Sequence, residues 1–145
     1  MTGHFISESQ LPTIAIDGGL SIEGLKPEKQ PGQHIRRIDG EDREASDEEI
    51  QRYYIDEVKK LGGKSIGIWS ATIALAVSSS NIVIMNYEYK TLFTSEPKGR
   101  IVEGAALDTI MIEPSTKRYY SEMKNSERPD IKYVLQFFRE YKDRL

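Results

Sequence analysis

The sequence predicts an α/β domain with a mixed, largely antiparallel twisted sheet flanked by helices. Three observations predict it: a short apolar segment that ends at Asp17, a β-rich block over residues 65–112, and stretches of helical periodicity on both sides of that block. The length of 145 residues suits one domain spanning residues 1–145, of which the polar residues 1–10 are expected to be loosely ordered.

Composition narrows the classes of function. The net charge of −3 argues against a nucleic-acid-binding protein, which would normally be basic. The chain has no cysteine, which excludes disulfides, thiolate catalysis and cysteine-ligated metal sites. With only two histidines, a bound metal would be held mainly by oxygen atoms, which favours magnesium or manganese.

The sequence also predicts where the protein resides. The first ten residues have neither the basic start nor the apolar run of a signal peptide. The most apolar stretch, residues 66–77, is too short and too polar to cross a bilayer. We therefore expect a cytoplasmic protein without a membrane partner.

The N-terminal third predicts a strand, a loop and a helix. Residues 11–17 are apolar almost throughout, which is typical of a central strand, and residues 20–25 predict a short extended or turn segment. Residues 26–44 hold two prolines, two glycines and many charges, and predict a long loop. Residues 46–61 predict a helix that begins with a capping box of Ser46 and Glu49 and ends at Gly62.

The rest of the chain predicts a hairpin, further short strands and a final helix. Residues 65–77 and 82–89 predict two strands joined by the turn 78–81. Residues 90–94 and 100–103 could extend the sheet around a turn at 96–99, and residues 109–112 predict a last strand. Pro129 suits the first turn of a helix over residues 129–145.

Two charged groups in the N-terminal third are candidate functional residues. Asp17 meets two glycines at the expected strand end, where a carboxylate could hold a divalent metal or accept a proton from water; it could also simply form a turn. Arg36 and Arg37 follow a Pro-Gly turn and could hold phosphate, or could be ordinary surface arginines. In an extended chain only one of the two would face a site.

The C-terminal third offers two more candidates. Residues 117–128 are dense in groups that can bind phosphate, and backbone N–H groups at the following helix start could help to hold an anion; the alternative is a charged loop with a helix cap. Asp108 could accept hydrogen bonds from the ring N–H groups of a ligand, or form a turn. We expect Trp69 and the tyrosines to serve the core or an interface rather than to stack on a base.

The order of these segments resembles that of the inosine triphosphate pyrophosphatase family, enzymes that remove noncanonical purine nucleoside triphosphates. Residues 16–20 (IDGGL) resemble the family's Asp-Asp-Ser-Gly-Leu motif. Further along, Pro31, Gly32, Arg37 and Gly40 match a second motif without a gap, and Ser46-Asp47 match its Thr-Asp helix start. Residues 105–108, 121–123, 124–125 and 126–128 resemble its later motifs, so the resemblance runs from residue 11 to the C-terminus.

The resemblance implies roles for six residues. Asp17 would be the catalytic proton acceptor and a metal-associated carboxylate, with Mg²⁺ as the cofactor. The substrate would be bound by Gly18, Arg37, Asp108, Lys124 and Arg128, with Asp108 on the base. The implied reaction converts a nucleoside triphosphate to a monophosphate and pyrophosphate, and the implied assembly is a homodimer.

The sequence also departs from the family pattern. Only about ten residues precede the strand of Asp17, where the family has a further phosphate-binding motif. Ile16 and Gly18 replace an aspartate and a serine, Ala105 and Leu107 replace aromatics, and Glu127 replaces a histidine. Three functions therefore stay open: a pyrophosphatase, a non-catalytic nucleotide-binding homologue, and a structural subunit that pairs with another chain.

Overall fold

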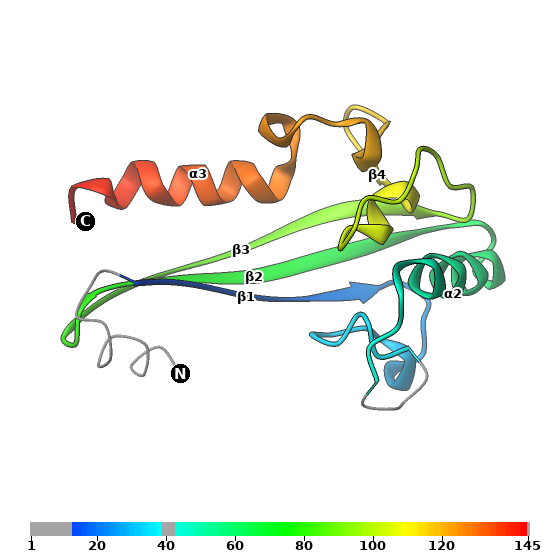
Figure 1. Ribbon diagram of the computed structural model, residues 1–145, viewed down its shortest axis with the longest axis horizontal. Coiled ribbons are helices and arrows are strands. Elements are labelled where there is room, and N and C mark those ends of the chain that lie inside the picture. The colour runs from blue at the N-terminus through cyan, green and yellow to red at the C-terminus, as the bar shows by residue number, and fades with distance from the viewer. Residues whose placement is uncertain (1–12, 39–42, 145) are drawn as a thin grey trace.

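The computed structural model describes residues 13–38 and 43–144. Their five strands form one antiparallel sheet in the order β1-β2-β3-β4-β5, and two long helices accompany it (Figure 1). This confirms the predicted fold class; the expected loose ordering of residues 1–10 lies outside the described residues. The elements are β1 (Thr13–Ile22), η1 (Pro27–Lys29), α2 (Asp47–Lys60), β2 (Lys64–Ser78), β3 (Asn81–Thr94), η2 (Ala106–Ile110), β4 (Met111–Glu113), β5 (Arg118–Tyr119), η3 (Tyr120–Glu122), η4 (Asn125–Glu127), α3 (Pro129–Tyr141) and η5 (Lys142–Arg144).

The hairpin of β2 and β3 contains the two longest strands of the sheet. Its register runs from Lys64 opposite Thr94 to Ser78 opposite Asn81, so the predicted hairpin is confirmed and the second strand continues through residues 90–94. Figure 1 shows α2 at one end of this hairpin and α3 lying along the other. None of the helices in the described residues has the length and apolar character that crossing a membrane requires.

The predicted central position of the first strand is wrong. Among the described residues β1 pairs only with β2 along its length, and the side chains of Ile14 and Ile16 are 38% and 53% exposed. The strand also continues to Ile22 instead of ending at Asp17. Gly18 is extended because it pairs with Ala71 of β2, and this close approach requires a glycine, since a Cβ atom would lie 2.9 Å from the carbonyl oxygen of Ser70.

Two predicted strands in the C-terminal half are also corrected. Residues 100–103 form no strand. Residues 106–110 form the 3-10 helix η2, so β4 begins only at Met111. The reason lies in the contacts of Thr109: this buried residue donates its hydroxyl to the carbonyl of Ala106 at 2.8 Å and accepts from Gln51 Nε2 of α2 at 2.9 Å. These bonds close a helical turn at a β-branched residue that periodicity alone assigns to a strand.

Helix α2 begins as predicted. Ser46 Oγ accepts from the backbone N–H of Glu49 at 3.2 Å, and Glu49 Oε1 accepts from the backbone N–H of Ser46 at 3.0 Å. The hydrogen bond from Arg43, followed by those from Ser46, lowers the pKa of Glu49 to about 2.

The capping box makes a testable prediction for acid stability. Because the pKa of Glu49 is lowered in the folded state, its contribution is fully present above pH 4.5 and is lost as the pH falls through about 2. Thermal unfolding of Glu49→Gln should therefore converge with that of the parent protein as the pH is lowered through this window. The neighbouring Glu48→Gln serves as control and should show no such convergence; equal pH dependence of the two variants would contradict the prediction.

Two separate apolar clusters lie on the same face of the sheet. Because side chains alternate along a strand, Leu20, Trp69 and Tyr89, which are paired across β1, β2 and β3, share one face. At one end of this face Leu20, Ile22 and Phe93 pack against α2. At the other end Ile73 and Leu75 pack against Phe137 of α3.

Candidate functional site

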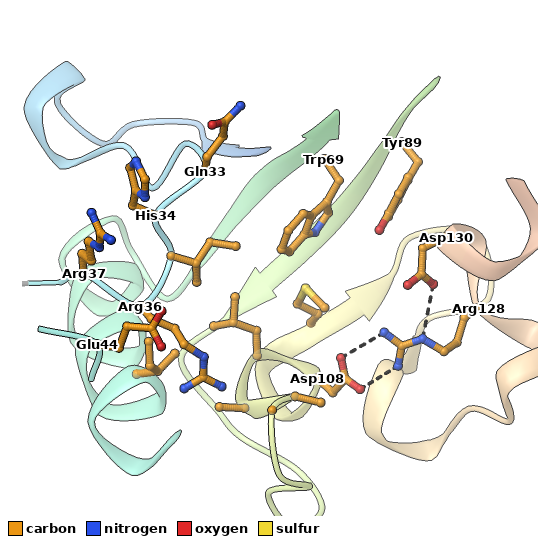
Figure 2. Close-up of a pocket in the computed structure, with 17 residues that line it drawn as sticks. Gln33, His34, Arg36, Arg37, Glu44, Trp69, Tyr89, Asp108, Arg128 and Asp130 are labelled. Atoms are coloured by element: carbon orange, nitrogen blue, oxygen red, sulfur yellow. Dashed lines mark hydrogen bonds and ion pairs between the residues drawn. The ribbon is translucent and has the colours of Figure 1, made fainter. Parts of the chain in front are cut away.

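A cavity of about 450 Å³ lies on this face (Figure 2). Its floor includes Trp69 and Tyr89 of the long hairpin. Its walls come from the loop before α2, from η2 with the turn before it, and from the start of α3. The polar and aromatic residues that line it are Gln33, His34, Arg36, Arg37, Glu44, Trp69, Tyr89, Asp108, Arg128 and Asp130.

An ion-paired arginine forms one wall of the cavity. Arg128 Nη1 donates to Asp108 Oδ2 at 2.6 Å and Nη2 to Asp108 Oδ1 at 3.3 Å, while its Nε donates to Asp130 Oδ1 at 3.3 Å. The guanidinium also lies 5.3 Å from the centre of the Tyr120 ring. Burial works to lower the pKa of Arg128, but the hydrogen bonds and charges of Asp108 and Asp130 outweigh it and raise the pKa above its ordinary value.

This arrangement suits a polar ring better than a phosphate. Two carboxylates neutralise the guanidinium, so it offers little net positive charge to a polyanion. The pair instead presents carboxylate acceptors beside guanidinium donors on the cavity wall, where Figure 2 shows them. A heterocycle that carries both N–H groups and carbonyl oxygens matches such a wall.

Two further arginines of the cavity, Arg36 and Arg37, come from the loop before α2. Arg36 donates from Nη2 to Asp47 Oδ1 at 2.5 Å and from Nη1 to the carbonyl of Ala45 at 3.1 Å, which fixes this loop to the start of α2. Its hydrogen bond is the main cause that lowers the pKa of Asp47. The exposed Arg37 lines the cavity as well, although only one of the two was expected to face a site. The expectation fails because a turn, closed by the Arg37 N–H to His34 carbonyl bond at 3.0 Å, replaces extended chain here.

The aromatic floor was missed by the sequence analysis. Trp69 and Tyr89 do pack against the α2 cluster, as expected of core residues, but both also line the cavity. Gln33, His34 and Asp130 were likewise not singled out. Alternation along the strands could have put Trp69 and Tyr89 on one face, but only the observed register places them directly opposite each other.

Asp17 lies on the other face of the sheet. The uninterrupted register of β1 sets it opposite Thr72, on the face away from Leu20 and the cavity. It is exposed, accepts a hydrogen bond from Gln33 Nε2 at 3.5 Å, and lines a separate hollow of about 370 Å³ with Gly18, Thr72 and Asn86. Gln33 lines both hollows, so they approach each other around the β1 edge.

The six predicted site residues therefore fall into three groups. Arg37, Asp108 and Arg128 meet in the cavity, and Asp17 and Gly18 share the second hollow. Lys124 is exposed and lines neither; its backbone N–H donates to Glu127 Oε1 at 2.9 Å. We expected the backbone N–H groups at the start of α3 to help hold a bound anion. The first turn of this helix already contains the carboxylate of Asp130. The chemical roles of all six stay predictions.

The described residues offer little to a metal ion on their own. They contain no group of three histidine, aspartate or glutamate side chains that could hold one. Among those that line the second hollow, Asp17 is the one carboxylate. Since magnesium is often bound through one or two carboxylates together with substrate phosphates, Asp17 fits an ion that arrives with a polyphosphate, not a resident one.

Comparison with known proteins connects this geometry to a fold. No protein-family model and no curated sequence matches the chain. Among solved structures, a HAM1 protein from Coxiella burnetii matches 91% of this chain and 69% of its own at 22% identity, with a TM-score of 0.65. The Ham1 protein of Staphylococcus aureus matches 94% and 70% at 18% identity, with a TM-score of 0.66.

A third solved structure carries a functional name. The nucleoside-triphosphatase or dITP/XTP pyrophosphatase from Mycobacterium abscessus matches 93% of this chain and 68% of its own at 19% identity, with a TM-score of 0.61. All three matches leave about three tenths of the neighbour's own chain uncovered. The chain thus has the fold of the Ham1 and dITP/XTP pyrophosphatase structures over the part of them that it covers, as its resemblance to the inosine triphosphate pyrophosphatase family implies.

Proposed function

We propose that this protein binds a purine nucleoside triphosphate and hydrolyses it to the monophosphate and pyrophosphate. One observation carries the proposal: Arg37, Asp108 and Arg128, which are far apart in the sequence, line one cavity in a chain with the pyrophosphatase fold. The base lies against the Asp108–Arg128 pair, where Asp108 accepts from ring N–H groups and Arg128 donates to a ring carbonyl. Trp69 and Tyr89 provide the apolar floor beneath it.

The polyphosphate extends from the cavity past Arg37 and Gln33 toward the β1 edge. There Asp17, as an exposed carboxylate, takes the proton of the attacking water. The water oxygen forms a bond to the α-phosphorus, the anhydride bond to the β-phosphate breaks, and pyrophosphate leaves with the electron pair. A magnesium ion held by Asp17 and the phosphates would supply charge neutralisation.

A second candidate is a nucleotide-binding protein that does not hydrolyse its ligand. The observation that favours it is the electrostatics of the second hollow: among the described residues that line it there is no lysine or arginine to balance a triphosphate. The arginines of the neighbouring loop, Arg36 and Arg37, line the first cavity instead.

Asp17→Asn separates the two functions. If Asp17 is the proton acceptor, the variant should release pyrophosphate from inosine or xanthosine triphosphate roughly 10²–10⁴-fold more slowly while its calorimetric affinity for the nucleotide is kept. Asp56→Asn, an exposed carboxylate on α2, is the matched control and should leave both quantities unchanged. Nucleotide binding without any pyrophosphate release by the parent protein would establish the binding function, and absence of both would overturn the proposal.

A further inference from the structure

A groove of about 670 Å³ lies between α3 and β3, apart from the cavity and from the hollow of Asp17. It is lined by Tyr89 and Lys90 of β3, by the turn after β4, by the segment before α3 and by one side of α3. The ring of Tyr133, which stacks on Tyr87 with 4.6 Å between ring centres, borders it. Its volume is within the range of roughly 300–1,000 Å³ that small-molecule sites occupy. We call it the α3 groove.

Two lysines give the α3 groove its positive charge. Its two carboxylates are already engaged: that of Glu113 accepts from backbone N–H groups of the turn after β4, at 2.8 and 3.1 Å, and that of Glu127 is paired with Arg118. Lys90 and Lys132 are exposed, and in the described part of the chain their ammonium groups have no hydrogen-bond or ion-pair partner. The groove therefore offers two uncompensated cations to an acidic ligand.

The backbone of β3 is open where it borders the groove. The carbonyl of Glu88 accepts from the Tyr133 hydroxyl at 3.4 Å, so the backbone groups of Glu88 point away from β2. Those of Lys90, two residues on, point the same way. The register with β4 sets Lys90 opposite Pro114, which has no N–H to donate. The ladder has already stopped there, and no described backbone group bonds to Lys90 on this side.

This opening suits a small ring better than a peptide. β4 occupies the edge on one side of Lys90, and Tyr133 covers Glu88 on the other. A peptide that adds a strand needs several consecutive open residues, whereas one amide group needs only one. The opposite edge of the sheet shows such a pairing: the side-chain amide of Gln30 accepts from the N–H of Ile22 at 2.7 Å and donates to its carbonyl at 2.8 Å.

We propose that the α3 groove is a second ligand site, for a small molecule that joins a lactam ring to a phosphate group, the chemistry of a nucleoside monophosphate. The lactam N–H and carbonyl pair with the backbone of Lys90 as the amide of Gln30 pairs with Ile22. The ring lies among the side chains of Tyr133 and Pro114. The phosphate accepts from the ammonium groups of Lys90 and Lys132.

This site shares a wall with the first cavity. Four consecutive residues at the start of α3 alternate between the two: Arg128 and Asp130 line the cavity, whereas Glu127 and Pro129 line the groove. Tyr89 lines both. An occupant of the groove thus contacts the back of the wall that holds Arg128. One consequence rests on the proposed function: its monophosphate product would bind here and alter turnover without competing for the cavity.

Calorimetry with inosine monophosphate tests the site. Lys90→Met combined with Lys132→Met should raise the dissociation constant at least about tenfold, because both charged contacts to the phosphate are lost. Lys59→Met combined with Lys64→Met is the matched control and should leave the constant unchanged. It removes the same charge from two exposed lysines that do not line the groove. Inosine alone and inorganic phosphate alone should each bind at least about tenfold more weakly than the monophosphate.

Lysine acetylation followed by mass spectrometry locates the ligand. Inosine monophosphate should protect Lys90 and Lys132 from acetic anhydride while Lys59 and Lys64 stay reactive. It should also inhibit pyrophosphate release from inosine triphosphate non-competitively, and this inhibition should be absent from the double variant of Lys90 and Lys132.

The outcomes separate this site from the proposed function. A parent protein that does not bind the monophosphate, or binding that the Lys90 and Lys132 substitutions leave unchanged, overturns the site. Purely competitive inhibition without protection of these lysines also overturns it, because the monophosphate then lies in the first cavity. Lysine-dependent binding by a protein that neither binds nor hydrolyses inosine triphosphate overturns the proposed function alone.

Discussion

Arg128→Met is expected to destabilise the protein by about 3 kcal/mol and to abolish nucleotide binding. The substitution keeps most of the side-chain volume but leaves Asp108 and Asp130 without their cation in a partly enclosed site. Removing one partner of a buried ion pair costs about 3–5 kcal/mol, and the low end applies because Arg128 and Asp108 keep 19% and 16% of their side-chain surface exposed. Urea unfolding measures the stability, and calorimetry with inosine triphosphate measures the binding.

Arg118→Met is the matched control for this experiment. Like Arg128, Arg118 is paired with a carboxylate, in this case that of Glu127, but the two side chains are 45% and 38% exposed. Such surface pairs contribute only about 0–1 kcal/mol, and Arg118 lies outside the cavity. Asp108→Asn combined with Arg128→Met completes a double-mutant cycle and should recover part of the lost stability. Equal losses in the two arginine variants would show that the cavity pair has no special importance.

Phe137→Ala is expected to cost about 3–5 kcal/mol, the usual range for deleting a buried phenylalanine. Phe137 is fully buried and is the centre of the cluster that holds α3 on the sheet through Ile73 and Leu75. Because α3 begins next to Arg128 and contains Asp130, loosening it should also weaken nucleotide binding. Hydrogen exchange of α3 amides should accelerate more than that of α2.

The control for the helix is Leu135→Ala. Leu135 lies on the same helix but is 44% exposed, so its truncation should change stability by no more than about 0.5 kcal/mol. If Phe137→Ala unfolds no earlier than Leu135→Ala, α3 is held to the sheet by something other than this cluster.

Local signals predicted the elements whose causes are local. The capping box predicted where α2 begins, and the glycine that follows the helix predicted where it ends. The turn residues 78–81 predicted the hairpin. Such signals could not predict that β1 lies at the edge of the described sheet. An apolar run of residues indicates a strand, but it does not show whether one or two strands pair with it. The 3-10 helix at Ala106–Ile110 depends on Gln51, a partner from a distant part of the chain.

The site was predicted only as far as the resemblance reached. It proposed five substrate-binding residues, and the structure brings three of them, Arg37, Asp108 and Arg128, into one cavity, whereas Gly18 and Lys124 lie outside it. Neither the second carboxylate on Arg128 nor the floor of Trp69 and Tyr89 could be derived, because both depend on strand register and on the path of the chain before α3. The position of Asp17 on the opposite face follows from β1 continuing through its glycines, where a turn was expected.

The division of the apolar interior into two clusters has a consequence for cooperativity. One cluster packs α2 against the sheet and the other packs α3 against it. The strands of the hairpin are the main connection between the two clusters. We therefore expect heat or denaturant to unfold one end of the molecule before the other, in two steps that circular dichroism and tryptophan fluorescence would separate. Ile50 and Met111 of one cluster and Asp130 of the helix that belongs to the other all border the cavity. A ligand seated there would bridge both halves and merge the two steps into one.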